Sequence, residues 1–180
     1  MNNFNLLIST SRYNEHNAKA EIWFTLLMCG DQYSIISSLD FQGLIAATTT
    51  LNHRKIIKKI KDILIQNPYF FQFILKIIPI DYVCQTDIKT IKMIIQKNYQ
   101  HYIKNQDSFK IALNRRKNEL IDRDGLIESI AKLFKNRVDL EHPDKIIRVE
   151  VLGNFTGISF LTPDEIIKAS NKIINQNFSK

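Results

Sequence analysis

Four short apolar runs alternate with two amphipathic stretches in the first half of the chain. The apolar runs have the length of β-strands and cover residues 4–10, 33–38, 44–48 and 73–83. Residues 14–30 and 52–67 carry apolar side chains at three- and four-residue intervals instead, as helices with one buried face do. The resulting order, βαββαβ, predicts a ferredoxin-like fold.

A longer amphipathic stretch opens the second half. Thr86 and Asp87 are suited to cap a helix that reaches about Tyr102. An alternating strand is expected over residues 109–114, and a second helix over residues 126–134, where the apolar positions recur at helical spacing. This part of the chain therefore predicts a helix-covered sheet of its own.

The remaining pattern predicts two strands and a last helix. The strands cover residues 146–151 and 155–160 and turn at Gly153. Thr162 followed by Pro163 is a typical helix start, and the expected helix carries Ile166, Ile167, Ala169 and Ile173. We place a domain boundary near residue 84, which gives an α+β protein: a ferredoxin-like (βαββαβ) domain over 1–84 and an α/β domain over 85–180.

Composition and charge indicate a globular protein with an acidic partner. The 180 residues are 44% hydrophobic and 24% charged, an ordinary globular composition. The net charge of +7 favours a polyanion, most simply a nucleic-acid backbone. The alternative is that lysines merely decorate solvated faces.

The residues offer little catalytic chemistry. Cys29 and Cys84 have no neighbouring ligand, the four histidines are dispersed, and the five glycines form no phosphate loop. Asp122 and Asp124 fit a helix start better than acid–base catalysis. We expect no enzyme activity, no cofactor and no metal. The longest uncharged apolar run, residues 22–29, is too short to span a bilayer, and no targeting segment is visible, so a cytoplasmic protein without membrane contact is expected.

A binding surface is the stronger hypothesis. Lys110 and Asn114 share one face of the strand over 109–114, which leads into a basic triplet. If the basic residues after the next helix lie on the same side, the two groups form one groove for RNA phosphates, with neutral polar residues for sugar and base edges. The full candidate set is Lys110, Asn114, Arg115, Arg116, Lys117, Lys132, Lys135, Asn136, Arg137, Asn154 and Thr156. An exposed strand end and a solvated helix face remain the alternative.

The order and spacing of several short motifs in residues 109–160 resemble a THUMP domain, an RNA-binding module of tRNA-modifying systems. These motifs are Phe109-Lys110-Ile111 with Arg115-Arg116, Val138-Asp139-Leu140 with Pro143-Asp144, Val149-Glu150-Val151, and Gly157-Ile158-Ser159. The resemblance places Arg115, Arg116 and residues 132–137 at the RNA surface, whereas Asp139, Pro143 and Glu150 shape a turn and a strand. Asn136 stands where relatives commonly carry a histidine.

The resemblance also implies a function. No catalytic part follows the THUMP-like region, as in the stand-alone adaptors of tRNA acetyltransferases. Such an adaptor holds the acceptor 3′ CCA end of tRNA for an acetyltransferase, acting in trans, that makes N4-acetylcytidine. Two alternatives stay open: the RNA-binding subunit of a split THUMP enzyme for methylation or thiolation, and a basic protein–protein module.

Overall fold

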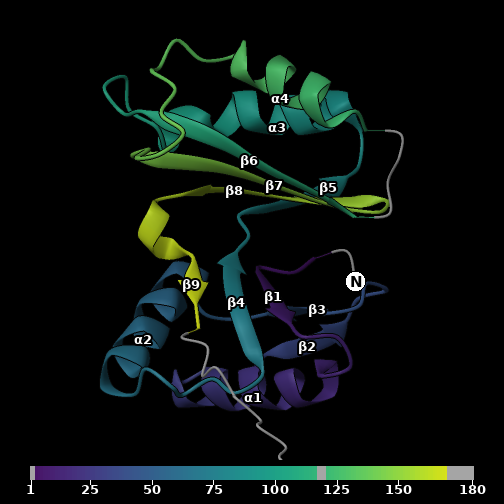
Figure 1. Cartoon of the computed structure of the whole chain (residues 1–180), viewed down its shortest axis with the longest axis vertical. Coiled ribbons are helices and arrows are strands. Elements are labelled where there is room, and N and C mark those ends of the chain that lie inside the picture. Colours follow the sequence, from purple (N-terminus) through teal and green to yellow (C-terminus); the bar gives the residue numbers. More distant parts are fainter. Residues whose placement is uncertain (1–2, 117–120, 170–180) are drawn as a thin grey trace, which may run out of the picture.

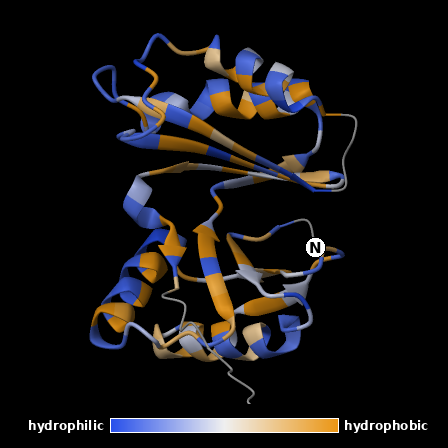
Figure 2. Cartoon of the chain, viewed as in Figure 1, coloured by the Kyte–Doolittle hydropathy of each residue, from blue (hydrophilic) through white to orange (hydrophobic). Residues whose placement is uncertain are grey.

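Two sheets, each covered by helices on one face, turn their uncovered faces toward each other in the computed structural model (Figure 1). The structure describes residues 3–116 and 121–169. Hydrophobic residues follow the strands and the inward faces of the helices, and polar residues follow most of the outer helix faces (Figure 2). The first helix is an exception, because it exposes Trp23, Phe24 and Met28. Burial of these apolar positions is the main force that holds each layer.

The first sheet has the predicted ferredoxin-like order. Its elements are β1 (Leu6–Thr10), α1 (Glu15–Met28), β2 (Ile35–Ser38), β3 (Leu44–Thr48), α2 (His53–Gln66) and β4 (Ile74–Pro79). The strands lie in the order β2-β3-β1-β4, with all pairs antiparallel. At the start of α2 the Asn52 side chain accepts hydrogen bonds of 3.1 Å from the amides of Arg54 and Lys55, so it caps the helix as its residue type favours.

The second sheet confirms the predicted α/β arrangement. Its elements are β5 (Tyr82–Gln85), α3 (Ile88–Asn98), a 3₁₀ turn η1 (Tyr99–His101), β6 (Phe109–Arg116), α4 (Arg123–Ala131), β7 (Lys145–Leu152) and β8 (Phe155–Leu161). The order is β5-β8-β7-β6, and only β6 and β7 are parallel. Because α4 connects these two parallel strands, it runs back against the direction of β6. That reversal decides where the basic residues lie.

Two sequence predictions are wrong in detail. Residues 73–83 are not one strand: β4 ends at Pro79, and β5 begins at Tyr82 and pairs with β8 of the second sheet. The helix expected after Thr162 is a single turn, η2 (Pro163–Glu165), followed by β9 (Ile167–Lys168), which pairs with β4 of the first sheet. Ile167 is buried there in the first core, which favours the strand over a continued helix.

The chain therefore crosses between the sheets twice, once after Ile80 and again through η2. The domain boundary at residue 84 stays a prediction. β5 begins before it, at Tyr82, but belongs to the second sheet, and β9 follows it but belongs to the first sheet. Residues 170–180, including Ile173 of the expected helix, lie outside the described residues.

An apolar layer and a polar cluster around Arg54 join the two sheets. The layer is built from both sides, with Leu7 and Ile78 below and Ile146 and Leu152 above. Beside it, the Arg54 guanidinium donates to Asp81 at 2.7 Å and to Glu165 at 2.6 Å, and also to the Phe160 carbonyl at 2.8 Å. It lies over the Tyr102 ring, 5.6 Å from the centroid. One side chain of α2 thus ties the first sheet to the second.

Candidate nucleic-acid interface

The predicted basic residues lie at the two ends of β6 rather than in one groove. The strand spans Phe109 to Arg116, about 23 Å at roughly 3.3 Å per residue. Arg115 and Arg116 end the strand, whereas the residues after α4 return to its start, where Val138 bridges to Phe109. The single groove expected from the sequence is therefore divided into two groups.

The group at the end of β6 is partly occupied by contacts within the protein. The Arg115 guanidinium donates to the Ile121 carbonyl, and that of Arg116 donates to the Gln42 carbonyl at 3.1 Å. Asn154 is exposed at the neighbouring β7–β8 turn. Lys117 lies outside the described residues. Arg116 also lines an open hollow of about 830 Å³, together with Arg12, Glu15 and Asp40 among others.

The group at the start of β6 is more open. Lys132 pairs with Glu128 at 2.7 Å, and Arg137 with Asp139 at 3.4 Å, but the Lys132 and Arg137 side chains are 72% and 77% exposed. Lys135 is exposed and makes no ion pair with the residues that the structure describes. Exposed pairs of this kind neutralise each other weakly and exchange readily for a polyanion.

Two further members of this group have structural partners. The Lys110 ammonium lies 3.4 Å from the Leu140 carbonyl. The Asn136 amide donates to the carbonyls of Lys104 at 2.8 Å and Asp107 at 3.0 Å, so it holds the turn that leads into β6. Asn136 therefore shapes the surface on which Lys135 and its neighbours are presented.

Thr156 does not lie on the surface. Its side chain is fully buried, and its hydroxyl oxygen is 2.9 Å from that of Thr86. The prediction that it contacts RNA is wrong in this structure, because Thr156 shares the helix-covered face of β8 with Ile158 and Phe160. The Asn114 amide is also engaged, with the Glu150 carboxylate at 3.2 Å.

The turn and strand residues behave as the resemblance implied. Asp139 accepts hydrogen bonds from the amides of His142 at 2.8 Å and Glu141 at 3.2 Å, which lower the pKa of its carboxyl below the usual value. Pro143 is buried beneath this turn, and Glu150 is buried in β7. These residues fix the backbone next to the exposed cations.

The described residues show few groups that could hold a metal or act as a nucleophile. No group of three or more potential metal-ligating side chains occurs within 3–116 and 121–169. Cys29 is buried, and burial raises the pKa of Cys84 to about 11, so its thiol is protonated near neutral pH. Among the helices of the described part of the chain, none is long and apolar enough to cross a membrane.

Three cations that the sequence interpretation did not include are found between the sheets: Lys76 on β4, Lys168 on β9 and Arg148 on β7. Lys76 and Arg148 each follow two apolar residues in a strand, and Lys168 was expected on the last helix, so no sequence pattern linked the three. The sequence therefore does not predict that these cations of the two sheets lie close together.

Comparison with known proteins finds a domain family that the second half of the chain matches. Residues 85–161 match the family model described as the THUMP domain. A Drosophila melanogaster protein named "THUMP domain-containing protein 1 homolog" is 32% identical over 108 residues, which covers 57% of this chain and 33% of that protein. The chain therefore spans about a third of the curated relative that it matches.

Solved structures share the fold across both halves. A protein from Pyrococcus horikoshii aligns with a TM-score of 0.66 and 16% identity, covering 93% of this chain and 56% of that one. A 4-thiouridine synthetase, solved with RNA and ATP, aligns with a TM-score of 0.55 and 13% identity, covering 93% of this chain and 42% of that one. At these identities the likeness extends to the fold alone.

Proposed function

We propose that this chain, whose residues 85–161 match the THUMP domain, is a tRNA-binding adaptor in tRNA modification. The adaptor presents tRNA, through its acceptor 3′ CCA end, to a cytidine N4-acetyltransferase that acts in trans. The Drosophila relative, which is named for its THUMP domain, supports a role of this domain type for the matching segment. The solved RNA complex of a protein with this fold supports RNA as the ligand.

The observation that carries the proposal is the exposed cation group at the start of β6. Lys132, Lys135 and Arg137 all lie inside the segment that matches the THUMP domain, and none is neutralised by a buried partner. Cations of this kind bind phosphates by releasing counterions. The turn held by Asn136 presents them on a fixed backbone, which lowers the entropy lost on binding.

A second candidate is the RNA-binding part of an enzyme. This chain covers 42% of the 4-thiouridine synthetase and 44% of TrmN from Thermus thermophilus, so these proteins extend well beyond the shared fold. Co-purification separates the candidates: an acetyltransferase partner supports the adaptor, and a methyltransferase or thiolation subunit supports the split enzyme.

A gel-shift titration tests the adaptor proposal directly. The protein is titrated against tRNA with an intact 3′ CCA end and against the same tRNA with that end removed. Tight binding that is lost on trimming is the expected result. Equal binding to both would contradict recognition of the 3′ end, and no binding to either would contradict the tRNA-binding function itself.

A variant tests the cation group. Replacing Lys132, Lys135 and Arg137 with Gln should weaken tRNA binding and reduce the slope of log K against log salt by roughly 0.7 to 0.9 per lost phosphate contact. Lys89, Lys92 and Lys97 of α3, replaced by Gln, provide a charge-matched control on another helix. An unchanged salt slope in the folded triple variant would remove this group from the RNA surface.

A further inference from the structure

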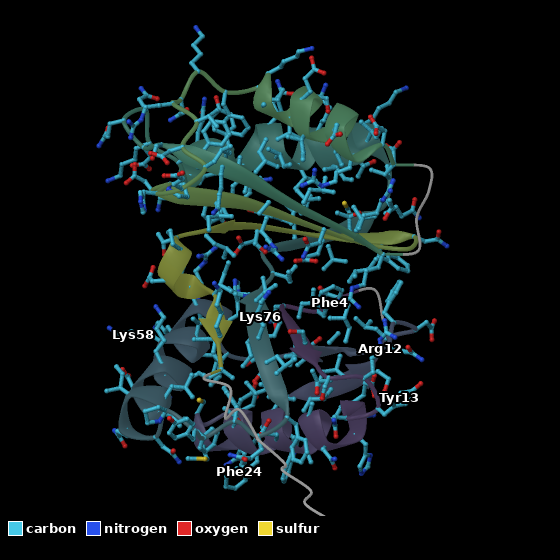
Figure 3. The ribbon with its side chains drawn as sticks, in the orientation of Figure 1. Phe4, Arg12, Tyr13, Phe24, Lys58 and Lys76 are labelled. Atoms are coloured by element: carbon cyan, nitrogen blue, oxygen red, sulfur yellow. The ribbon has the colours of Figure 1, made fainter. Side chains whose placement is uncertain are left out.

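The uncovered faces of the two sheets meet over an apolar region and also over a charged one. On β4, Lys76 shares its face with Ile78, which belongs to the apolar layer between the sheets, and Lys168 on β9 is its direct partner across the strands. On β7, Arg148 and Glu150 lie on the same face as Ile146 and Leu152 of this layer. Lys76 is labelled in Figure 3, on β4 where it runs below the second sheet.

These side chains are close enough to act on one another. Burial lowers the pKa of Lys76, and so do the positive charges of Arg148 and Lys168, whereas the Glu150 carboxylate acts in the opposite direction. Lys76 and Lys168 belong to the first sheet and Arg148 to the second, so the cluster spans the junction.

The cluster has more positive than negative charge. Glu150 already accepts a hydrogen bond of 2.6 Å from Arg148, with which it also forms an ion pair at 2.6 Å, and a hydrogen bond of 3.2 Å from Asn114. Neither Lys76 nor Lys168 has a hydrogen-bond or ion-pair partner among the side chains described in the structure. Like charges directly opposite each other across two strands destabilise a sheet, with Cβ atoms about 5 Å apart. A pair of this kind is retained at a net cost unless an anion joins it.

We infer that Lys76 and Lys168, supported by Arg148, bind a backbone phosphate of the RNA at the junction of the two sheets. This inference rests on the proposed tRNA-binding function and extends it, because it gives the N-terminal sheet a direct contact with the RNA. Arg148 is 13% exposed and held by Glu150, so it contributes a fixed positive charge, and the two lysines supply free ammonium donors.

The position of the cluster favours a nucleic-acid chain over a small anion. Lys110 lies on the same face of the edge strand β6, two residues before Ala112, which is the register partner of Arg148. Cations therefore continue from the junction along the sheet edge to the exposed group at the start of β6. A ligand with phosphates at regular spacing can contact both places, and an isolated phosphate can contact only one.

The test compares two double variants of the full chain for tRNA affinity as salt is varied. In the first, Lys76→Gln and Lys168→Gln remove the free ammonium groups. In the control, Lys55→Gln and Lys58→Gln remove the same charge from the exposed face of α2, where Figure 3 labels Lys58. The expected result is a loss of affinity of roughly tenfold or more near 0.1 M salt and a salt slope lower by roughly 0.7 to 0.9, as for one lost phosphate contact, for the first variant, with a much smaller change for the control.

Each outcome has a separate meaning. Equal effects of the two double variants, with wild-type binding intact, would overturn the junction site and leave the tRNA-binding function standing. Absence of wild-type binding would overturn both. Stabilisation of the wild-type protein by inorganic phosphate, without any loss of RNA affinity in the Lys76→Gln/Lys168→Gln variant, would show a small-anion site instead and overturn the assignment to RNA. Thermal unfolding of both variants confirms that they are folded.

Discussion

Two charged clusters connect the sheets, and they differ in how completely their charges are paired. Around Arg54, two basic side chains meet the carboxylates of Asp81 and Glu165, and each basic side chain has a close partner. Around Lys76, three cations face the single carboxylate of Glu150. The difference indicates two roles, because a paired cluster is complete within the fold, whereas one with excess charge is completed by a ligand.

The largest effect is expected from breaking the paired cluster. Arg54→Met should reduce the free energy of unfolding by about 3 to 5 kcal/mol, because it leaves the Asp81 carboxylate, 3% exposed, without its main partner. Arg123→Met, in an exposed pair with Asp124, is the control and should change stability by about 1 kcal/mol or less. Urea unfolding measures both, and equal losses would contradict the structural role of Arg54.

Removing the Glu150 carboxylate from the cluster around Lys76 should lower the stability of the fold without weakening tRNA binding. Glu150→Gln leaves Arg148 largely buried without an anion and should cost about 2 to 3 kcal/mol of unfolding free energy. The same change increases the excess positive charge, so tRNA binding at low salt should be as tight as in the wild type or tighter. Weaker tRNA binding by the folded variant would contradict the proposal that the excess positive charge of this cluster binds an RNA phosphate.

A smaller effect is expected from acid. Burial alone would raise the pKa of Asp81, but hydrogen bonds from His53 and the Phe160 amide and the charge of Arg54 together lower it. Because the folded pKa lies below the unfolded one, Asp81 contributes stability that is present above about pH 4 and lost as pH falls through the folded pKa. Wild-type stability should therefore fall more steeply below pH 4 than that of Asp81→Asn. Unfolding titrations at several pH values measure this. An equal loss of unfolding free energy below pH 4 in the wild type and in Asp81→Asn would contradict the role of Asp81.

Much of the fold could be predicted from the sequence because periodicity reports burial. The apolar spacing located the first four strands and their two helices, and residue type identified Asp87 as a helix cap. Periodicity does not say which strand pairs with which, so the pairing of Tyr82–Gln85 with β8 and of Ile167–Lys168 with β4 was missed. These pairings depend on contacts between residues far apart in the chain.

The candidate site was predicted less well, for two physical reasons. A helix that connects parallel strands returns toward the start of the first strand, so residues 132–137 cannot lie beside Arg115 and Arg116. Strand alternation also places Thr156 on the buried face with Ile158. Both conclusions follow from general geometry and could have been reached from the sequence. The junction of Lys76 with Arg148 could not, because it depends on how the sheets stack.

Amine-reactivity footprinting of the full chain, with and without tRNA, tests the central claim most directly. The exposed and half-exposed lysines are labelled, and the modification of each is measured by mass spectrometry. The account predicts that tRNA protects Lys132 and Lys135 together with Lys76 and Lys168, while Lys55 and Lys58 on the outer face of α2 keep their reactivity. Protection of the α2 lysines, with Lys76 and Lys168 as reactive as in the free protein, would contradict it.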